Sequence, residues 1–265
     1  MERIFIVGCS RSGTTIFQRL FSSYYNFYTA PETGFFLPGG LHLALRHQNI
    51  CYPEYTCRTL STICNSQHLS SVRSLKFSDY VDLFLLHFDE MAINHNLEGW
   101  VEKTPLHLLR ISLIKKYIQN AHFIIVVREP LSVLNSMLKR SSNYPKFKYQ
   151  NARTSIQLIN KSMRHTLLHA SSPYCSLVSF EKFKKDPECI FDLLSHKLCI
   201  PRSRRKLSTH FNILRPGEDW KKEHRSDKIN DNPLSFSHLA LPEAVDAFNL
   251  IDYSLYNKIK HYFCS

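Results

Sequence analysis

The chain has 265 residues, and its 34 lysines and arginines against 22 aspartates and glutamates give a formal net charge of +12. Apolar residues make up 43% of the chain, charged residues 21%, and there are only 7 glycines. This composition excludes a collagen-like or generally disordered protein, and no apolar run reaches the roughly 20 residues of a membrane-spanning helix. The positive charge favours an anionic partner such as a nucleotide, a nucleic acid or an acidic polymer. We predict one domain over residues 1–265, without a signal sequence and with a cytoplasmic location.

Short apolar runs alternate along the chain with stretches of helical period. Apolar residues recur every three or four positions over Phe77–Met91, Ile156–Leu167 and Val245–Ile259, which indicates helices with one buried face. Five runs have the length and residue types of β-strands. They lie at Arg3–Gly8, Asn26–Ala30, Gly99–Lys103, His122–Val127 and Tyr174–Phe180. This alternation predicts an α/β fold of three layers, α/β/α, around a central, mostly parallel sheet of about five strands.

The eight cysteines predict neither a disulfide framework nor a metal site. A chain of this length has enough core residues to fold without disulfides. The only close group, Cys51, Cys57 and Cys64, has five and six residues between its members, which matches no zinc-binding spacing. The surrounding segment, Gln48–Ser74, lacks a clear period, and we expect it to be an irregular insertion near the strand ends.

A glycine-containing loop follows the first predicted strand and precedes a predicted helix at Ile16–Ser23. Its sequence is Gly8-Cys9-Ser10-Arg11-Ser12-Gly13-Thr14-Thr15, and its glycine spacing is that of a phosphate-binding loop. A nucleotide triphosphatase would carry Lys at position 14 to reach the β- and γ-phosphates. Here Thr14 occupies that place, and the cation comes three residues earlier as Arg11. The loop is therefore suited to holding a terminal phosphate and poorly suited to magnesium-dependent γ-phosphate transfer.

A second phosphate-binding pattern follows the fourth predicted strand. Arg128-Glu129-Pro130 ends the strand, and Ser136 lies eight residues after Arg128, about two turns into the next helix. An arginine and a hydroxyl in this arrangement can hold one phosphate from two sides. The alternative is an arginine that pairs with a carboxylate.

These two loops resemble the sulfotransferases that use 3′-phosphoadenosine 5′-phosphosulfate (PAPS). R-S-G-T-T at positions 11–15 resembles the family's 5′-phosphosulfate loop, and Arg128 with Ser136 resembles its 3′-phosphate motif. Phe180–Phe183 with Asp186–Glu188 is similar to a structural segment of the family. Arg215-Pro216-Gly217, followed by Trp220, resembles a late loop that closes over the nucleotide, except that Pro216 replaces a cation. Two short motifs could coincide by chance, but four motifs in the family's order over most of the chain make chance a poor explanation.

The resemblance implies a P-loop type of α/β fold, PAPS as co-substrate, adenosine 3′,5′-bisphosphate (PAP) as product, and no required metal. It also implies which residues bind the donor. The expected donor-binding residues are Arg11, Ser12, Gly13, Thr14, Thr15, Arg128, Ser136, Arg215 and Gly217.

Glu32, in the run Ala30–Phe36 after the second predicted strand, is the candidate general base. Its Pro, Gly and Phe neighbours would partly desolvate the carboxyl group and raise its pKa, although a loop or helix-cap carboxylate is the alternative. In the tyrosylprotein and several carbohydrate sulfotransferases, which this region resembles, a Glu at this place is the base. His107 is the rival base, although a histidine so early in a helix is more often a cap or a supporting donor.

Lys103 lies in the run Trp100–His107, at the end of the third predicted strand. The run resembles the lysine-containing element of the Glu-base branch. By that resemblance Lys103 and Arg11 are catalytic residues, which neutralise charge on the leaving group and on the sulfuryl oxygens.

The sequence therefore predicts an enzyme that moves a sulfuryl group from PAPS to a hydroxyl, or less often an amine, of a glycan or a small-molecule metabolite. We expect the acceptor pocket to be lined by Tyr24–Tyr28, Phe35–Ser74 and Tyr144–Arg153. One alternative is a P-loop kinase of nucleotides or small molecules. A different class is a nucleic-acid-binding protein, suggested by the net charge and by basic runs such as Arg202–Lys206. In the preferred interpretation no nucleic acid is a partner.

Overall fold

A computed structural model of the chain describes residues 1–37, 76–143, 151–201 and 249–263. Its centre is a five-stranded sheet with the order β2-β3-β1-β4-β5, in which every neighbouring pair is parallel. The strands are β1 (Glu2–Gly8), β2 (Phe27–Thr29), β3 (Gly99–Lys103), β4 (Ala121–Val127) and β5 (Cys175–Ser179). The predicted sheet is confirmed, and each strand lies within a residue or two of its predicted bounds.

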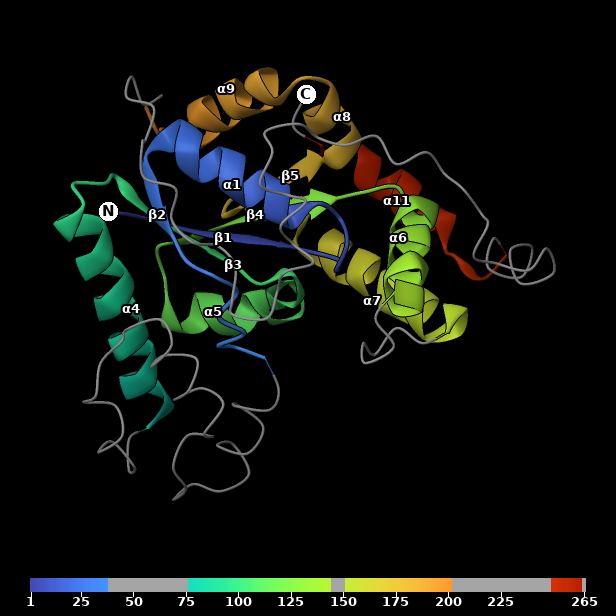
Figure 1. The fold of residues 1–265 in the computed structure, drawn as a ribbon, viewed down its shortest axis with the longest axis horizontal. Helices are drawn as coiled ribbons and strands as arrows, with labels where there is room; N and C mark the ends of the chain where they lie inside the picture. The colour runs from blue at the N-terminus through green and yellow to red at the C-terminus, as the bar shows by residue number, and fades with distance from the viewer. Residues whose placement is uncertain (38–75, 144–150, 202–248, 264–265) are drawn as a thin grey trace.

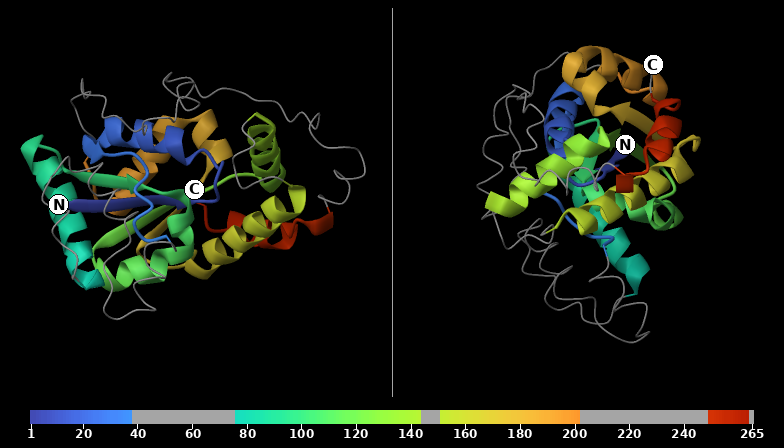
Figure 2. Two further views of the ribbon diagram at one scale, coloured as in Figure 1. Left: turned by 60° about the horizontal axis from the view of Figure 1, so that its bottom comes forward. Right: turned by 90° about the vertical axis from the view of Figure 1, so that its right-hand side faces the viewer.

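Helices cover both faces of the sheet (Figure 1). One face carries α1 (Thr14–Tyr25), α8 (Phe180–Lys185) and α9 (Pro187–Leu198). The other layer contains α4 (Phe77–Asn94), the 3-10 helix η2 (Pro105–Arg110), α5 (Ile111–Tyr117), α6 (Pro130–Asn143), α7 (Ala152–His169) and α11 (Tyr253–Lys260). Figure 2 shows the sheet between the two layers from two further sides. This arrangement confirms the predicted three-layer α/β fold.

Each layer packs its own apolar cluster against the sheet. On the α1 side, Phe17, Phe21 and Phe191 are buried against Ile4 and Val126 of the strands. The opposite cluster contains the apolar stripes predicted for Phe77–Met91 and Ile156–Leu167, now the inner faces of α4 and α7. A strand with an apolar cluster on each side is buried on both faces, which explains the continuous apolar run of β4.

The third predicted helical stripe is only partly within the described residues. Leu255 and Ile259 lie in α11, and Ile259 is fully buried. The helix begins at Tyr253 because the Asp252 side chain accepts a hydrogen bond from the backbone N–H of Leu255 and so acts as its N-cap. Val245 and Phe248 lie outside the described residues.

The expectation that Tyr24–Tyr28 lines the acceptor pocket is wrong. Phe27 is fully buried, and the Tyr28 ring packs against Phe88 of α4 with 5.6 Å between centroids. The Tyr25 hydroxyl donates to the backbone carbonyl of Phe191, and the Tyr24 hydroxyl donates to Asp192 at 2.6 Å. These aromatic side chains anchor α1 and the edge strand β2 to both helical layers. Of the other two predicted stretches, most lies outside the described residues, while Phe35 and Phe36 belong to the core.

The carboxyl ends of the parallel strands meet at one edge of the sheet, where ligands bind in open α/β folds. The loops after β1, β2, β3 and β4 leave this edge, so they bring together segments far apart in the sequence. Among the described residues, no helix is both long enough and apolar enough to cross a bilayer.

Candidate active site

The loop after β1 has a backbone shape that only particular residues allow. Gly13, the N-cap of α1, has φ +87°, and Arg11 has φ +73°, a left-handed conformation that costs a non-glycine residue about 1–2 kcal/mol. A Cβ on Gly13 would lie 2.1 Å from the ring of Phe180. Ser12 closes the turn, because its N–H and its hydroxyl both donate to the carbonyl oxygen of Cys9, at 3.1 and 2.7 Å. The loop therefore presents its turn and the start of α1 in one defined shape.

The two phosphate-binding patterns predicted from the sequence meet in space. Arg11 Nε donates to the hydroxyl of Ser136 at 3.2 Å, although the two residues are 125 positions apart. Arg128 Nη1 donates to the backbone carbonyl of Arg11 at 3.3 Å. The Arg128 guanidinium lies 5.0 Å from the centroid of the Phe180 ring, the same ring that contacts Gly13. Two arginines and a serine hydroxyl are thus gathered beside the N-terminus of α1.

The turn that carries Arg128 is fixed by two carboxylates. The N–H of Glu129 donates to Glu181 Oε1 at 2.9 Å, and the Glu129 carboxylate accepts the N–H groups of Leu131 and Ser132 at the start of α6. The hydroxyl of Tyr253 in α11 also donates to Glu129, at 2.7 Å. Burial lowers the pKa of Arg128, while the nearby Glu181 and Glu129 act in the opposite direction. Glu181 thus belongs to a segment with the structural role that the resemblance implied.

Lys103 and Glu32 form an ion pair at the same edge of the sheet. The Lys103 side chain, at the end of β3, is 1% exposed, and the Glu32 side chain is 28% exposed. Lys103 Nζ also donates to the hydroxyl of Thr15 in the first turn of α1, at 3.2 Å. The lysine therefore links the phosphate loop to the Glu32 loop. The ammonium thus lies directly beside the carboxylate that is the candidate base.

His107 is placed where it does not compete with Glu32 as a base. The imidazole is fully buried, its Nδ1 lies 2.9 Å from Glu102 Oε2, and its Nε2 lies 3.1 Å from the backbone nitrogen of Phe36. Because the Phe36 N–H donates to Nε2, that nitrogen is the acceptor, and Nδ1–H donates to Glu102 Oε2. Both ring nitrogens are thus occupied by protein partners, as expected of a supporting histidine.

Glu102 is a buried carboxylate that the sequence analysis did not single out. It is 1% exposed and is bound by Thr33, Thr104 and His107. Burial alone would raise the pKa of Glu102, but its interactions with His107, Thr104 and Thr33 together hold that pKa below its ordinary value. In the sequence, Glu102 stands at the end of a strand, two residues before Thr104 and five before His107. This spacing could have suggested a hydrogen-bonded group, but only the structure shows that the group binds the Glu32 loop.

The structure does not describe every predicted site residue. Arg215, Gly217 and the neighbouring Trp220 lie outside the described residues, and so do Cys51, Cys57 and Cys64. Thr14 is buried at the first position of α1. Burial raises the pKa of the Cys9 thiol to about 12, although Ser162 of α7 acts in the opposite direction, so this thiol stays protonated near neutral pH.

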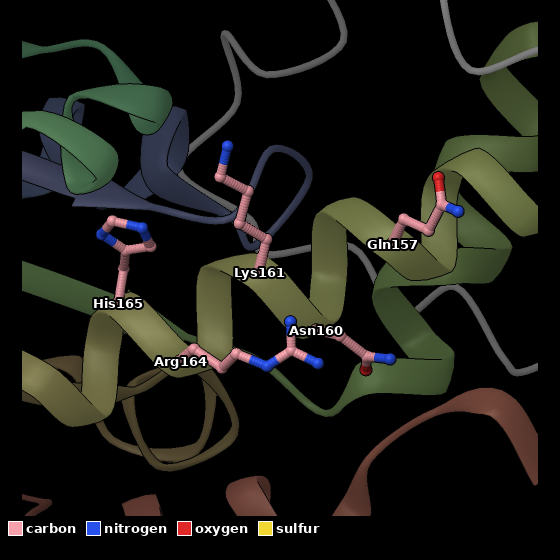
Figure 3. Close-up of a pocket in the computed structure, with 5 residues that line it drawn as sticks. All are labelled: Gln157, Asn160, Lys161, Arg164 and His165. Carbon is pink, nitrogen blue, oxygen red and sulfur yellow. The ribbon is translucent and has the colours of Figure 1, made fainter.

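A cavity of about 420 Å³ lies along the outer face of α7 (Figure 3). Its lining is polar and mostly basic: Gln157, Asn160, Lys161, Arg164 and His165. Asn160 binds the C-terminal segment, because its amide donates to the Leu250 carbonyl and its oxygen accepts the Asp252 N–H. Burial lowers the pKa of His165, and the positive charges of Lys161 and Arg110 lower it further. Cationic groups therefore gather beside this cavity.

The chain belongs to the sulfotransferase family, whose model matches residues 3–204, about three quarters of the sequence. The fold is similar to that of a sulfotransferase domain from the Synechococcus PCC 7002 olefin synthase, with a TM-score of 0.60, 17% identity and coverage of 94% of both chains. It is also similar to the sulfotransferase domain from the curacin biosynthetic pathway, with a TM-score of 0.53, 18% identity and coverage of 92% of this chain and 96% of the other. A sulfotransferase from Alicyclobacillus acidocaldarius gives a TM-score of 0.52 at 15% identity, with coverage of 84% of this chain and 89% of that one. A comparison with curated protein sequences gave no significant match.

The protein is therefore an enzyme of the sulfuryl-transfer class, as its sequence predicted. Family membership favours this activity over the P-loop kinase and the nucleic-acid-binding alternatives. The phosphate loop without lysine at position 14 agrees with that choice, because Thr14 begins α1 where a kinase would need a cation for the β- and γ-phosphates.

Proposed function

We propose that this enzyme transfers a sulfuryl group from PAPS to a hydroxyl of a glycan or a small-molecule metabolite, with Glu32 as general base. The observation that carries the proposal is the meeting of Arg11, Arg128 and Ser136 beside the N-terminus of α1. PAPS carries anionic groups at both its 3′ and 5′ positions. The loop after β1 and the neighbouring Arg128 and Ser136 offer cations and hydroxyls for both groups. The Lys103–Glu32 pair then lies at the edge of the sheet where the sulfuryl group would be transferred.

This geometry supports the proposed donor-binding residues. The loop, Thr14 and Thr15 lie at the positive N-terminal end of α1, which suits the 5′-phosphosulfate. Arg128 and Ser136 suit the 3′-phosphate, because a planar guanidinium and a hydroxyl can bind separate oxygens of one phosphate. Arg215 and Gly217 keep their predicted role in closing over the nucleotide. The bound donor supplies the sulfuryl group, and the other steps depend on side chains of this chain.

Glu32 and Lys103 divide the remaining chemistry. The Glu32 carboxylate takes the proton from the acceptor hydroxyl as its oxygen attacks, a step for which a positioned base contributes roughly 10²–10⁴-fold in rate. Lys103, held by Thr15 at the start of α1, offers its ammonium to the charge that develops on the leaving side. Arg11 contributes a second cation from the phosphate loop. With these cations in place the reaction needs no metal ion, so a chelator should not stop it.

The single-domain organisation, the cytoplasmic location and the absence of a nucleic-acid partner stay predictions from the sequence. The glycan or metabolite acceptor is also a prediction. Three basic residues in α8, Lys182, Lys184 and Lys185, prompted the nucleic-acid alternative, and they lie at the C-terminal end of that helix, where cations complement the helix dipole. Tight binding to random duplex DNA that weakens steeply with salt would support that alternative instead.

Calorimetry tests the donor site directly. We expect PAP to bind with micromolar affinity in excess EDTA, and ATP to bind much more weakly. Arg128→Ala should weaken PAP binding by about 10- to 100-fold, the usual cost of removing a hydrogen bond to a charged group. Arg153→Ala, at an exposed position of α7, is the control for loss of a positive charge. Absence of PAP binding, together with magnesium-dependent ATP binding, would contradict the proposal and favour a kinase.

A further inference from the structure

The loop that carries Glu32 is anchored on both sides of that residue. Before it, the Gln18 amide of α1 donates to the Thr29 hydroxyl at 2.7 Å and to the Ala30 carbonyl at 2.9 Å. Thr29 in turn donates to the carbonyl of Val101 in β3 at 3.1 Å. The start of the loop is thereby tied to α1 and to β3.

After Glu32, side chains from the end of β3, from Thr104 and from η2 bind the backbone of the loop. The N–H of Thr33 donates to Glu102 Oε1 at 3.2 Å, and its hydroxyl donates to the same oxygen at 2.8 Å. The N–H of Gly34 donates to the Thr104 hydroxyl at 3.0 Å. The N–H of Phe36 donates to His107 Nε2 at 3.1 Å. Loop backbone groups that no strand or helix pairs are therefore satisfied by side chains.

The three supporting residues also bind one another. The Thr104 hydroxyl donates to Glu102 Oε1 at 2.6 Å, and His107 Nδ1–H donates to Glu102 Oε2 at 2.9 Å. Exposure is 1% for Glu102, 3% for Thr104, and 0% for His107 and Thr33. Every member is buried and hydrogen-bonded, so the network permits one arrangement of the loop, since any other would leave buried polar groups unpaired.

The loop is held from both faces of β3. Successive residues of a strand point to opposite faces, so Glu102 and Lys103 project on opposite sides of the sheet. Two successive loop residues follow the same division: Glu32 pairs with Lys103, and Thr33 binds Glu102. The loop therefore crosses the end of the strand, with one residue fixed on each side.

We propose that Glu102, Thr104 and His107 are positioning residues that hold the Glu32 carboxylate in place against Lys103 for proton abstraction. The inference rests on the proposed role of Glu32. In it, the three residues do not touch the substrate and affect sulfuryl transfer only by holding the backbone of the Glu32 loop. If these side chains served only to stabilise the fold, apolar residues could replace them and would avoid the cost of burying a carboxylate. A network of polar contacts defines the loop backbone more narrowly, and a misplacement of about 1 Å can cost about 100-fold in rate.

Paired variants of Thr104 test the inference. Thr104→Val keeps the side-chain size but removes the acceptor for the Gly34 N–H and the donor to Glu102, whereas Thr104→Ser keeps both. The assay is hydrolysis of PAPS to PAP and sulfate, in which water takes the place of the acceptor hydroxyl. We expect Thr104→Val to lower kcat for this reaction by about 10- to 100-fold. The affinity for PAP should change by less than about twofold, because the donor contacts lie in other loops. Thr104→Ser should recover most of the rate. Thr33→Val and Thr33→Ser form a second pair if the first valine variant folds poorly.

Hydrogen exchange of the backbone amides supplies a readout that does not depend on turnover. In Thr104→Val, exchange of the peptide spanning Thr33–Phe36 should accelerate, while exchange within α1 and β1 stays at the wild-type rate. An unchanged exchange rate in this peptide, or an unchanged kcat, would overturn the inference. A loss of PAP affinity parallel to the loss of kcat would overturn it as well, because it would indicate a general structural defect. Failure of the wild-type enzyme to bind PAP would instead count against the proposed function.

Discussion

The two loops that build the candidate site are held by different means. The phosphate loop after β1 is shaped by its backbone: Gly13 and Arg11 are left-handed, and Gly13 leaves no space for a side chain beside Phe180. The Glu32 loop is held mainly by side chains that come from elsewhere in the chain, Gln18 on one side and the group around Glu102 on the other. The first loop is thus encoded in eight consecutive residues, and the second depends on residues about 70 positions away.

This difference separates binding from chemistry. A backbone-shaped loop suits an invariant ligand group such as a phosphate, because N–H groups at a helix N-terminus need no particular side chain. A catalytic carboxylate must instead be placed to within a fraction of an ångström, and the surrounding polar contacts supply that placement. Changes to the backbone shape of the first loop should therefore affect donor affinity, and changes around the second should affect the rate of transfer.

The largest expected effect is on turnover, from Glu32→Gln. The amide keeps the size of the side chain but cannot accept the acceptor proton, so kcat should fall by about 10²- to 10⁴-fold while PAP affinity stays nearly unchanged. Radiolabelled sulfuryl transfer and calorimetry measure the two quantities. Glu98→Gln, at an exposed position, is the control for loss of one carboxylate. Full turnover in Glu32→Gln would show that another group is the base.

A smaller effect, on binding and stability, is expected from Gly13→Ala. The new methyl group would overlap the Phe180 ring, and alanine disfavours φ +87°, so the free energy of unfolding should drop by about 2–5 kcal/mol. PAP affinity should fall with it, because the loop loses its shape. Denaturant unfolding and calorimetry measure both effects.

The double variant Gly13→Ala/Phe180→Leu divides this effect between its two causes. Removing the ring relieves the steric overlap but leaves the unfavourable φ, so recovery should be partial. Wild-type PAP affinity in Gly13→Ala would contradict the view that the backbone shapes this loop.

The smallest expected effect is a pH dependence of stability that involves Glu102. Its pKa in the folded protein lies below the ordinary value of 4.5, so between these two values the unfolded chain binds more protons than the folded one. The resulting stability is fully present above pH 4.5 and is lost as the pH falls through the folded-state pKa. The stability advantage of the wild type over Glu102→Gln should therefore shrink on acidification, as urea unfolding from pH 7 to pH 3 would show. An advantage that stays constant over this range would mean that the carboxylate is not preferentially ionised in the fold.

Much of the fold was predictable from the sequence because its signals are local. Apolar runs bounded by polar residues indicated all five strands of the sheet, and apolar spacing indicated the buried faces of α4 and α7. The prediction for Tyr24–Tyr28 was wrong because an aromatic run at an expected pocket edge looks the same as one that anchors an edge strand. Only the packing of Tyr28 against Phe88 of α4 distinguishes the two.

By itself the sequence determined the order of strands and helices, the loop of phosphate-binding type at residues 8–15, and the residue types proposed to bind anions and to move a proton. The tertiary structure decided which of these residues meet: Arg11 with Ser136, Lys103 with Glu32, and His107 with Glu102 instead of the acceptor. The physical reason is the separation along the chain over which each interaction acts. Backbone conformation and helix periodicity depend on near neighbours along the chain, whereas a hydrogen bond between positions 70 or 125 residues apart exists only after the sheet has aligned its strand ends.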